Sequence, residues 1–171
     1  MEDKRIVKMK GQELTLSGSP VKVGDSAPDF EVVANDLSQV KLSSFQGKIC
    51  LIASVPSLDT SVCDTEIRKF NEQATSLADN VVVLAVSMDL PFAQGRWCGA
   101  AGVKNVQTLS DYRYADFGEK FGVLIEELRL LARAVFIVDE EGIIRYIQIV
   151  EEVSHEPDYE ETLEALKGIT G

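Results

Sequence analysis

The sequence predicts an α/β protein in which helices cover both faces of a mixed central sheet. The first observation is a strand–helix–strand unit of about 40 residues, from position 48 to 87, where two apolar runs enclose an amphipathic stretch. Such a unit joins parallel strands through a right-handed crossover. The second observation is a predicted antiparallel hairpin followed by a helix near the end of the chain. Together they predict a sheet with both parallel and antiparallel neighbours.

The segment before the first buried strand is predicted to contain short strands and turns. Two strand-like pieces, residues 6–9 and 13–16, meet at Gly11 and form a surface hairpin. A loop follows, marked by Gly18, Pro20, Gly24 and Pro28. A brief strand is then predicted at 30–33 and a short turn at 42–45. Residues 48–55 form a strand with almost no polar side chain, so burial on both faces is expected.

A helix is predicted from about residue 60 to 78, followed by a second buried strand at 81–87. The apolar residues of the helix are spaced three and four apart, at Ile67, Phe70, Ala74 and Leu77. A short helix is predicted at 91–98, because Asp89 can cap it and Pro91 suits its first turn, with Gly99 and Gly102 suited to a stop. A strand at 106–109 and a helix at 114–121 come next.

The last segment is predicted to form strand 132–138, a turn at 139–142, strand 143–150 and a closing helix at 158–167. This helix places Tyr159, Leu163 and Leu166 on one face. The complete order of the predicted strands and helices fits a thioredoxin-like fold with an extra N-terminal hairpin and a helix–strand insertion. Because no repeat, linker or low-complexity segment interrupts the chain, residues 1–171 are predicted to form a single domain.

Composition narrows the class of protein. The chain has 171 residues, of which 45% are hydrophobic and 26% charged, as in ordinary globular proteins. A net charge of −11 argues against binding to nucleic acid or to an anionic membrane surface. No apolar run approaches the ~20 residues that span a bilayer. The charged N-terminus has no apolar core of a secretory signal, so a cytoplasmic location is expected.

Cys63 is the leading candidate for chemistry, because it lies in the first turn of the helix that follows a buried strand. The helix N-terminus favours a thiolate. Burial opposes it, and so do the carboxylates of Asp64 and Glu66, so a nearby cation is needed. Arg68 points elsewhere, about 140° around the helix at 3.6 residues per turn. Arg133 is the better candidate, since it begins an otherwise apolar strand and must find a partner or reach solvent.

Two further residues of this stretch have predicted roles. Thr60 lies three positions before Cys63 on the same line of the helix, and either Thr60 or Asp59 is the candidate N-cap. Pro56 stands where the strand leaves the sheet, and its fixed φ would stiffen the loop that presents Thr60 and Cys63.

The remaining cysteines and the single histidine are less informative. No CxxC motif is present, and one histidine cannot complete a Cys/His zinc pattern. Cys50, within an apolar run, is interpreted as an inert core thiol. Cys98, beside Trp97 in a short glycine-flanked helix, is left open between a core role and a reactive one. His155 is interpreted as a surface or capping residue.

Four segments of the chain resemble a known family. PSLDTSVC fits the Pro-x-x-x-Thr-x-x-Cys signature of peroxiredoxins, and DLPFAQGRWC, LARAVFIVDEEG and EPDYEETLEAL are similar to segments of bacterial thiol peroxidases, the atypical two-cysteine branch. The resemblance extends in order over nearly the whole chain. Trp97 stands where phenylalanine is expected, a conservative departure.

The resemblance implies a thioredoxin-like fold with no metal or organic cofactor. It implies that Cys63 is the peroxidatic cysteine and Cys98 the resolving cysteine, that Thr60 and Arg133 orient the peroxide and stabilise the thiolate, and that Pro56 shields the pocket. It further implies a homodimer with thioredoxin as reductant. The expected activity is a thiol-specific peroxidase that reduces hydrogen peroxide and organic hydroperoxides through a Cys63 sulfenic acid and an intramolecular Cys63–Cys98 disulfide.

Three alternatives stay open at this point. A thiol–disulfide oxidoreductase is disfavoured by the missing CxxC motif. A redox sensor would use the same disulfide without turnover, and an inert domain would simply bury three thiols. Because a disulfide needs Cα atoms within about 7 Å, we also expect the reduced form to hold Cys63 and Cys98 too far apart, so that both helix ends must loosen first.

Overall fold

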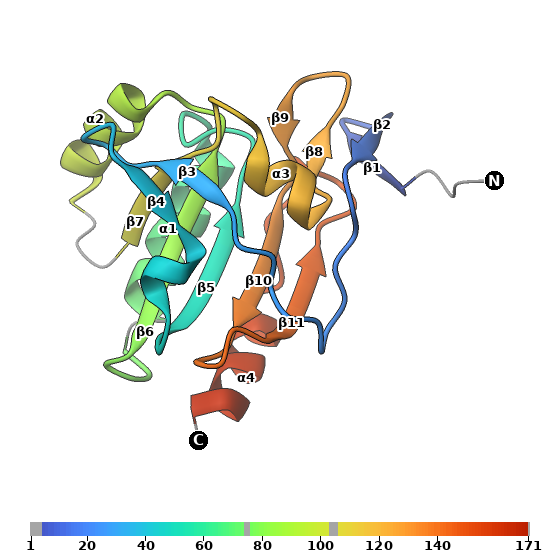
Figure 1. Cartoon of the computed structure of the whole chain (residues 1–171). Helices are drawn as coiled ribbons and strands as arrows, with labels where there is room; N and C mark the ends of the chain where they lie inside the picture. The colour runs from blue at the N-terminus through green and yellow to red at the C-terminus, as the bar shows by residue number, and fades with distance from the viewer. Residues whose placement is uncertain (1–4, 74–75, 103–105, 171) are drawn as a thin grey trace.

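The mixed α/β architecture is confirmed by a computed structural model, which describes residues 5–73, 76–102 and 106–170. In this part of the chain the main sheet has seven strands, in the order β11 (Ile144–Ile149), β10 (Ala134–Val138), β5 (Ile49–Ser54), β6 (Val81–Ser87), β7 (Val106–Ser110), β3 (Glu31–Val33) and β4 (Gln39–Lys41) (Figure 1). Strands β5 and β6 are parallel, as the strand–helix–strand unit predicts; β7 is also parallel to β6, and the other pairings of this sheet are antiparallel.

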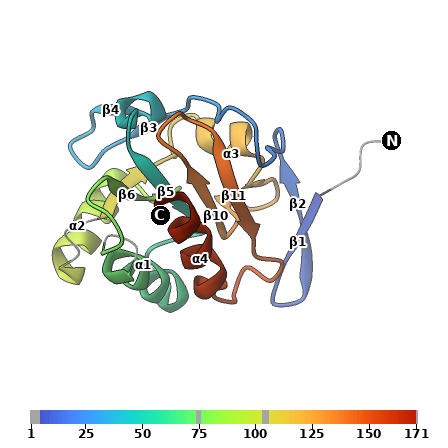
Figure 2. The ribbon, with the colours of Figure 1, turned by 90° about the horizontal axis from the view of Figure 1, so that it is seen from below.

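Helices cover both faces of this sheet. Helices α1 (Ser61–Gln73), α2 (Pro91–Ala101) and α4 (Tyr159–Thr170) lie along one face, and α3 (Asp116–Phe121) lies on the other (Figure 2). Every residue of β5 is buried, because β5 is a central strand covered on both sides. The short turn predicted before it is a 3-10 helix, η1 (Leu42–Phe45).

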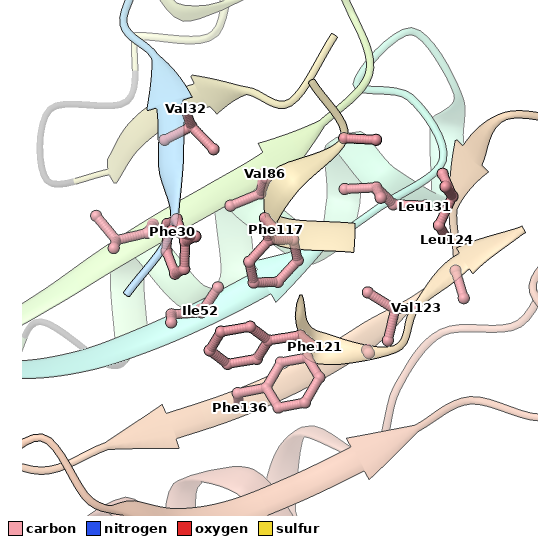
Figure 3. Packing of buried hydrophobic residues seen from close by; sticks show 14 of the residues in the cluster. Phe30, Val32, Ile52, Val86, Phe117, Phe121, Val123, Leu124, Leu131 and Phe136 are labelled. Carbon is pink, nitrogen blue, oxygen red and sulfur yellow. The ribbon is translucent and has the colours of Figure 1, made fainter. Parts of the chain in front are cut away.

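The alternation of β5 side chains separates two hydrophobic cores. Cys50 and Ile52 point into the core on the α3 side, while Leu51 and Ala53 point into the core beneath α1 and α4. The α3-side core is rich in aromatic rings: Phe117 and Phe121 contact each other, and each also contacts Phe30 and Phe136 (Figure 3). Cys63 belongs to the other core. Cys50 and Cys63 are therefore on opposite faces of the sheet.

The predicted N-terminal hairpin is present as β1 (Arg5–Met9) and β2 (Gln12–Ser17), which extend into a small second sheet with β8 (Leu124–Ile125) and β9 (Leu130–Leu131). Strands β4, β8 and β9 were not predicted. Each has only two or three residues, too few to show an alternating pattern.

Three predicted helix boundaries are wrong. Helix α1 ends at Gln73 rather than near 78; Ala74 lies outside the described residues, and residues 76–78 are not helical. Leu77 still packs against the core, but from a turn that leads the chain into β6. Helix α3 begins two residues later than predicted, because Ala115 has a φ of 51° and cannot continue a helix.

The third wrong boundary is that of α2, which continues through Gly99 and ends before Gly102, whose left-handed φ of 67° directs its N–H to the Cys98 carbonyl. Cys98 is therefore inside the helix rather than at its end. The predicted Asp89 cap is also wrong: Leu90 occupies the N-cap position without a side-chain hydrogen bond, because the Asp89 carboxylate is held by the loop after β5.

The hairpin is anchored to the segment that follows β11. The N–H of Lys8 donates to the Glu151 carbonyl, and the N–H of Val153 donates to the Lys8 carbonyl, both at 2.7 Å. At the hairpin turn, the N–H groups of Lys10 and Gly11 donate to the Glu152 carboxylate at 2.8 and 3.2 Å. The hydroxyl of Ser154 and these N–H groups lower the pKa of Glu152 to about 2.

We predict that Glu152→Ala loosens the hairpin turn without unfolding the sheet. Amide hydrogen exchange at Lys10 and Gly11, followed by NMR, should speed up roughly tenfold, because a charged acceptor is lost. Since the folded pKa of Glu152 lies below its ordinary value of 4.5, this anchoring is present above that pH and is lost as pH falls through about 2.

The matched control is Glu151→Ala, which removes an exposed side chain while keeping the carbonyl that accepts from Lys8. Exchange at the hairpin turn should match the wild type in this control. Equal exchange rates in Glu152→Ala and Glu151→Ala would contradict the anchoring role.

Candidate active site

Cys63 is the third residue of α1 and is completely buried. The chain leaves β5 at Ser54, passes through the buried Pro56, and enters the helix at Ser61. Thr60 is the N-cap: its hydroxyl oxygen accepts from the Cys63 N–H at 3.4 Å, and the hydroxyl donates to the Ser57 carbonyl at 3.1 Å. The first turn of the helix therefore presents the Cys63 sulfur at a capped N-terminus.

The loop before this helix is held by Asp89, a role that the sequence did not reveal. The Ser57 hydroxyl and the Leu58 N–H donate to the two Asp89 carboxylate oxygens at 2.7 and 2.8 Å, and the Ser87 hydroxyl adds a third bond at 2.7 Å. Because β5 and β6 are parallel neighbours, the loops at their carboxyl ends lie side by side. Asp89 thus fixes the cysteine loop from the next strand.

Arg133 reaches Cys63 through strand pairing. Strand β10 runs antiparallel to β5 and pairs Ala134 with Ser54, so the residue before Ala134 lies next to the end of β5. The Arg133 Nη1–H donates to the Cys63 Sγ at 3.3 Å, and its Nε–H donates to the Val153 carbonyl at 2.9 Å. Arg133 is only 2% exposed. The expected contact between Arg133 and Cys63 is therefore present.

Asp64 and Glu66, the two carboxylates expected to oppose a Cys63 thiolate, lie in different environments. Asp64 points away from the core, where its oxygens accept from Arg68 Nε at 3.0 Å and from Trp97 Nε1 at 2.8 Å. This arrangement confirms that Arg68 does not serve Cys63. Glu66 is fully buried, and its Oε2 lies 3.7 Å from Arg133 Nη1, which is within ion-pair range but too long for a hydrogen bond.

Burial raises the pKa of Glu66 to about 8, although Arg133 opposes the rise; Glu156 contributes further in the upward direction. Glu66 is consequently mostly neutral near pH 7. With Asp64 paired on the outer side of α1 and the pKa of Glu66 raised by burial, Arg133 is the charged group that contacts the Cys63 sulfur. The spacing in the sequence could have indicated that Glu66 faces the same side as Cys63, because residues three positions apart lie on the same face of a helix.

Cys98 lies half-buried in α2 and contacts the strand beneath it. Its Sγ is 3.3 Å from the Thr108 Oγ1, and the Thr108 hydroxyl donates to Asn35 Oδ1 at 3.0 Å. Because that hydroxyl has a single proton, the Cys98 S–H is the donor to Thr108. A groove of about 890 Å³ passes beside Cys98 and is lined in part by Asn35 and Thr108. All three cysteines are free thiols.

Among the described residues, two hydrogen bonds connect the helices that carry Cys63 and Cys98. The Trp97 ring N–H donates to the Asp64 carboxylate. Trp97 directly precedes Cys98, and Asp64 directly follows Cys63. In addition, Arg68 Nη1 donates to the Ala101 carbonyl at 3.0 Å. We call this pair of contacts the α1–α2 tie. It is a feature of the structure with the cysteines reduced.

The remaining candidates are Cys50, on the other side of the sheet, and His155, which lines a surface pocket together with Ser61 and Thr65 of α1. Cys50 faces the opposite core, where burial raises its pKa to about 12, against the weaker influence of Lys48. This supports its interpretation as an inert thiol. His155 is exposed, and its backbone N–H donates to the Glu152 carbonyl.

The described ranges show neither a metal-binding cluster nor a membrane-spanning helix. They contain no group of three or more His, Cys, Asp and Glu side chains arranged to hold a metal ion. None of their helices combines the length and the apolar character needed to cross a membrane.

Comparison with known proteins identifies the family. The sequence model of the Redoxin family matches residues 22–163. A thiol peroxidase of Oceanobacillus iheyensis is 58% identical over 94% of this chain and 97% of its own length. A thiol peroxidase of Bacillus subtilis is 52% identical over 95% of this chain and 97% of its own length.

Solved structures agree with the sequence comparisons. A peroxiredoxin-like protein from Aquifex aeolicus superimposes with a TM-score of 0.90 at 46% identity, covering 96% of this chain and 97% of that one. A thiol peroxidase from Chromobacterium violaceum, with a TM-score of 0.88 at 22% identity, shares the fold. The chain therefore belongs to the Redoxin family, among the peroxiredoxins of the thiol peroxidase group.

Proposed function

We propose that this peroxiredoxin is a thiol-specific peroxidase that reduces hydrogen peroxide and organic hydroperoxides through Cys63. The observation that carries the proposal is the Arg133 N–H on the Cys63 sulfur at 3.3 Å, with both side chains buried. A buried guanidinium favours the thiolate, which is the nucleophilic form of cysteine. The capped helix N-terminus acts in the same direction.

In the first step the Cys63 thiolate attacks the terminal oxygen of the hydroperoxide. The S–O bond forms as the O–O bond breaks, and the leaving oxygen takes a proton and departs as water or an alcohol. Arg133 and the backbone N–H groups of the α1 N-terminus stabilise the charge on that oxygen. The Thr60 hydroxyl orients the peroxide by turning from the Ser57 carbonyl, and Pro56 shields the pocket.

In the second step the Cys98 thiol attacks the Cys63 sulfenic acid, so that an S–S bond forms and water leaves. Thioredoxin, in a reducing compartment such as the cytoplasm, then restores both thiols by exchange. The groove beside Cys98 supports access of a partner thiol. We propose that the reduced form holds the two Cα atoms beyond disulfide range, and that the α1–α2 tie must break before the bond forms.

We further propose that the chain acts as a single domain that assembles as a homodimer. Large apolar side chains are exposed in the loops that follow β6 and β7 and at the start of α2. Leu90 is 52% exposed, Phe92 70% and Tyr114 62%. Exposed apolar groups of this size favour an interface over contact with water.

We predict that cysteine substitutions separate the roles of the three thiols. Peroxide consumption with thioredoxin and thioredoxin reductase should be abolished in Cys63→Ser. Cys98→Ser should consume about one equivalent per chain and then stop, because the sulfenic acid has no resolving thiol. Cys50→Ser is the matched control and should turn over normally, since Cys50 lies in the opposite core.

Several results would contradict this assignment. A folded but inactive Cys50→Ser would give Cys50 the catalytic role. Insulin reduction without peroxide consumption would favour a thiol–disulfide oxidoreductase. A wild type that oxidises once and is not recycled by thioredoxin would favour the redox sensor, which uses the same two cysteines without turnover.

We predict that Trp97→Phe speeds formation of the Cys63–Cys98 disulfide several-fold. Phenylalanine keeps an aromatic ring in the half-buried position but cannot donate to Asp64, so one contact of the α1–α2 tie is lost. The measurement is acid quenching and mass spectrometry at intervals after one equivalent of peroxide. Arg96→Gln, an exposed change on the same helix, should leave the rate unchanged. A slower or unchanged rate in Trp97→Phe would argue against the tie as a barrier.

A further inference from the structure

Glu66 is a buried acid for which the mechanism above has no use. Its side chain is fully buried, and within the described residues neither carboxyl oxygen has a hydrogen-bond partner. Such a group is unusual, because a buried carboxylate without hydrogen bonds is strongly destabilised. Its position is also specific. Glu66 Oε2 lies 3.7 Å from Arg133 Nη1, the same nitrogen that donates to the Cys63 sulfur.

The titratable and charged groups described around Glu66 lie on α1, directly before β10, and in α4 with the segment that precedes it. Arg133, which directly precedes β10, is the nearby cation, and Cys63 is one turn earlier on α1 itself. Glu156, in the segment before α4, adds negative potential, and the Tyr159 phenol of α4 also lies within electrostatic reach. The ammonium group of Lys69 is directed to Glu156, at 3.9 Å, and to the Tyr159 ring, at 4.4 Å.

One buried guanidinium therefore stands between two acids, Cys63 and Glu66. A single buried cation stabilises one buried anion well, while a second anion would lack a counter-charge. The two acids are thus in competition for Arg133. Burial raises the pKa of Glu66 to about 8, which is consistent with a protonated Glu66 when Cys63 is the anion.

We propose that Glu66 is a charge-balancing residue that holds a proton while Cys63 is a thiolate and releases it when Cys63 is oxidised. This inference rests on the proposed peroxidase function. The reactants are the Cys63 thiolate, the protonated Glu66 and the hydroperoxide. The products are the neutral Cys63 sulfenic acid, the Glu66 carboxylate, and an alcohol or water, so atoms and charge balance. The sulfur is oxidised and the peroxide is reduced. The proton that the leaving oxygen requires is matched by the one that Glu66 loses.

Oxidation therefore leaves the net charge of the buried cluster unchanged. Before the reaction Arg133 faces the thiolate, and after it Arg133 faces the Glu66 carboxylate. Without Glu66, oxidation would leave a buried guanidinium with no anion, which is costly in a low-dielectric interior. Glu66 acts through Arg133 and is a positioning residue, since no contact with the peroxide is required.

The test is the number of protons taken up per sulfenic acid formed. The Cys98→Ser chain, in which oxidation stops at the sulfenic acid, is mixed with one equivalent of hydrogen peroxide near pH 7 in weak buffer with a pH indicator. Dimedone labelling and mass spectrometry count the sulfenic acid. With Glu66 present, proton uptake should be close to zero, because Glu66 supplies the proton. With Glu66→Gln added, uptake should approach one proton per sulfenic acid.

Two comparisons sharpen this test. Glu72→Gln changes an exposed acid on the same helix, and its proton count should match that of the Cys98→Ser parent. In the parent, uptake should rise from near zero toward one as pH rises through about 8, since an ionised Glu66 has no proton to release. Equal proton counts in the parent and in Glu66→Gln, at any value, would overturn the proposal.

The outcomes also separate this inference from the proposed function. If no sulfenic acid forms in the parent, the peroxidase role of Cys63 fails, and the Glu66 proposal fails with it. If sulfenic acid forms with equal proton counts, only the Glu66 proposal fails. Should Glu66→Gln not fold, infrared difference spectra of the parent decide: the carbonyl band of a protonated carboxyl should disappear on oxidation, and its persistence would overturn the proposal.

Discussion

The contact between the Arg133 guanidinium and the Cys63 sulfur is the interaction on which the site depends. A buried cation needs a partner, and the Cys63 sulfur at the α1 N-terminus accepts a hydrogen bond from it. The two residues are 70 positions apart in the chain, and the antiparallel pairing of β10 with β5 brings them together. The Val153 carbonyl holds the other side of the guanidinium. Val153 is in turn fixed by Lys8 of the hairpin, so an apparently peripheral element contributes to the position of Arg133.

The acidic residues near Cys63 are each placed so that they do not oppose a thiolate. Asp64 is paired with Arg68 and Trp97 on the outer side of α1, and Asp89 is occupied by the Ser57–Leu58 loop. Glu66 faces the core but is neutral near pH 7, because burial raises its pKa to about 8. A protein with a net charge of −11 thereby keeps a positive group, Arg133, at the Cys63 sulfur. Asp64 and Arg68 also bond to residues of α2, so the residues that surround Cys63 connect the two cysteine helices.

The sequence predicted the elements with strong periodicity and the residues whose chemistry conflicts with their surroundings. The β5–α1–β6 unit followed from its apolar spacing, and Arg133 stood out as a charge in an apolar strand. Two-residue strands such as β8 carry too few residues for a pattern. Asp89 was mistaken for a helix cap, because a local motif cannot reveal a partner on the neighbouring strand. Glu66 was recognised from the sequence as a carboxylate near Cys63, but its complete burial beside Arg133 depends on tertiary packing that the spacing of residues does not show.

The measurement that tests the central interaction most directly is the rate of Cys63 oxidation in single-turnover mixing with peroxide at pH 7, comparing wild type with Arg133→Gln. Arg68→Gln is the control, because that arginine pairs with Asp64 and not with Cys63. If Arg133 maintains the thiolate and stabilises the leaving oxygen, the rate constant of Arg133→Gln should fall roughly a hundredfold or more, and that of Arg68→Gln should change little. A folded Arg133→Gln that reacts within about twofold of the wild-type rate would contradict the role assigned to this contact.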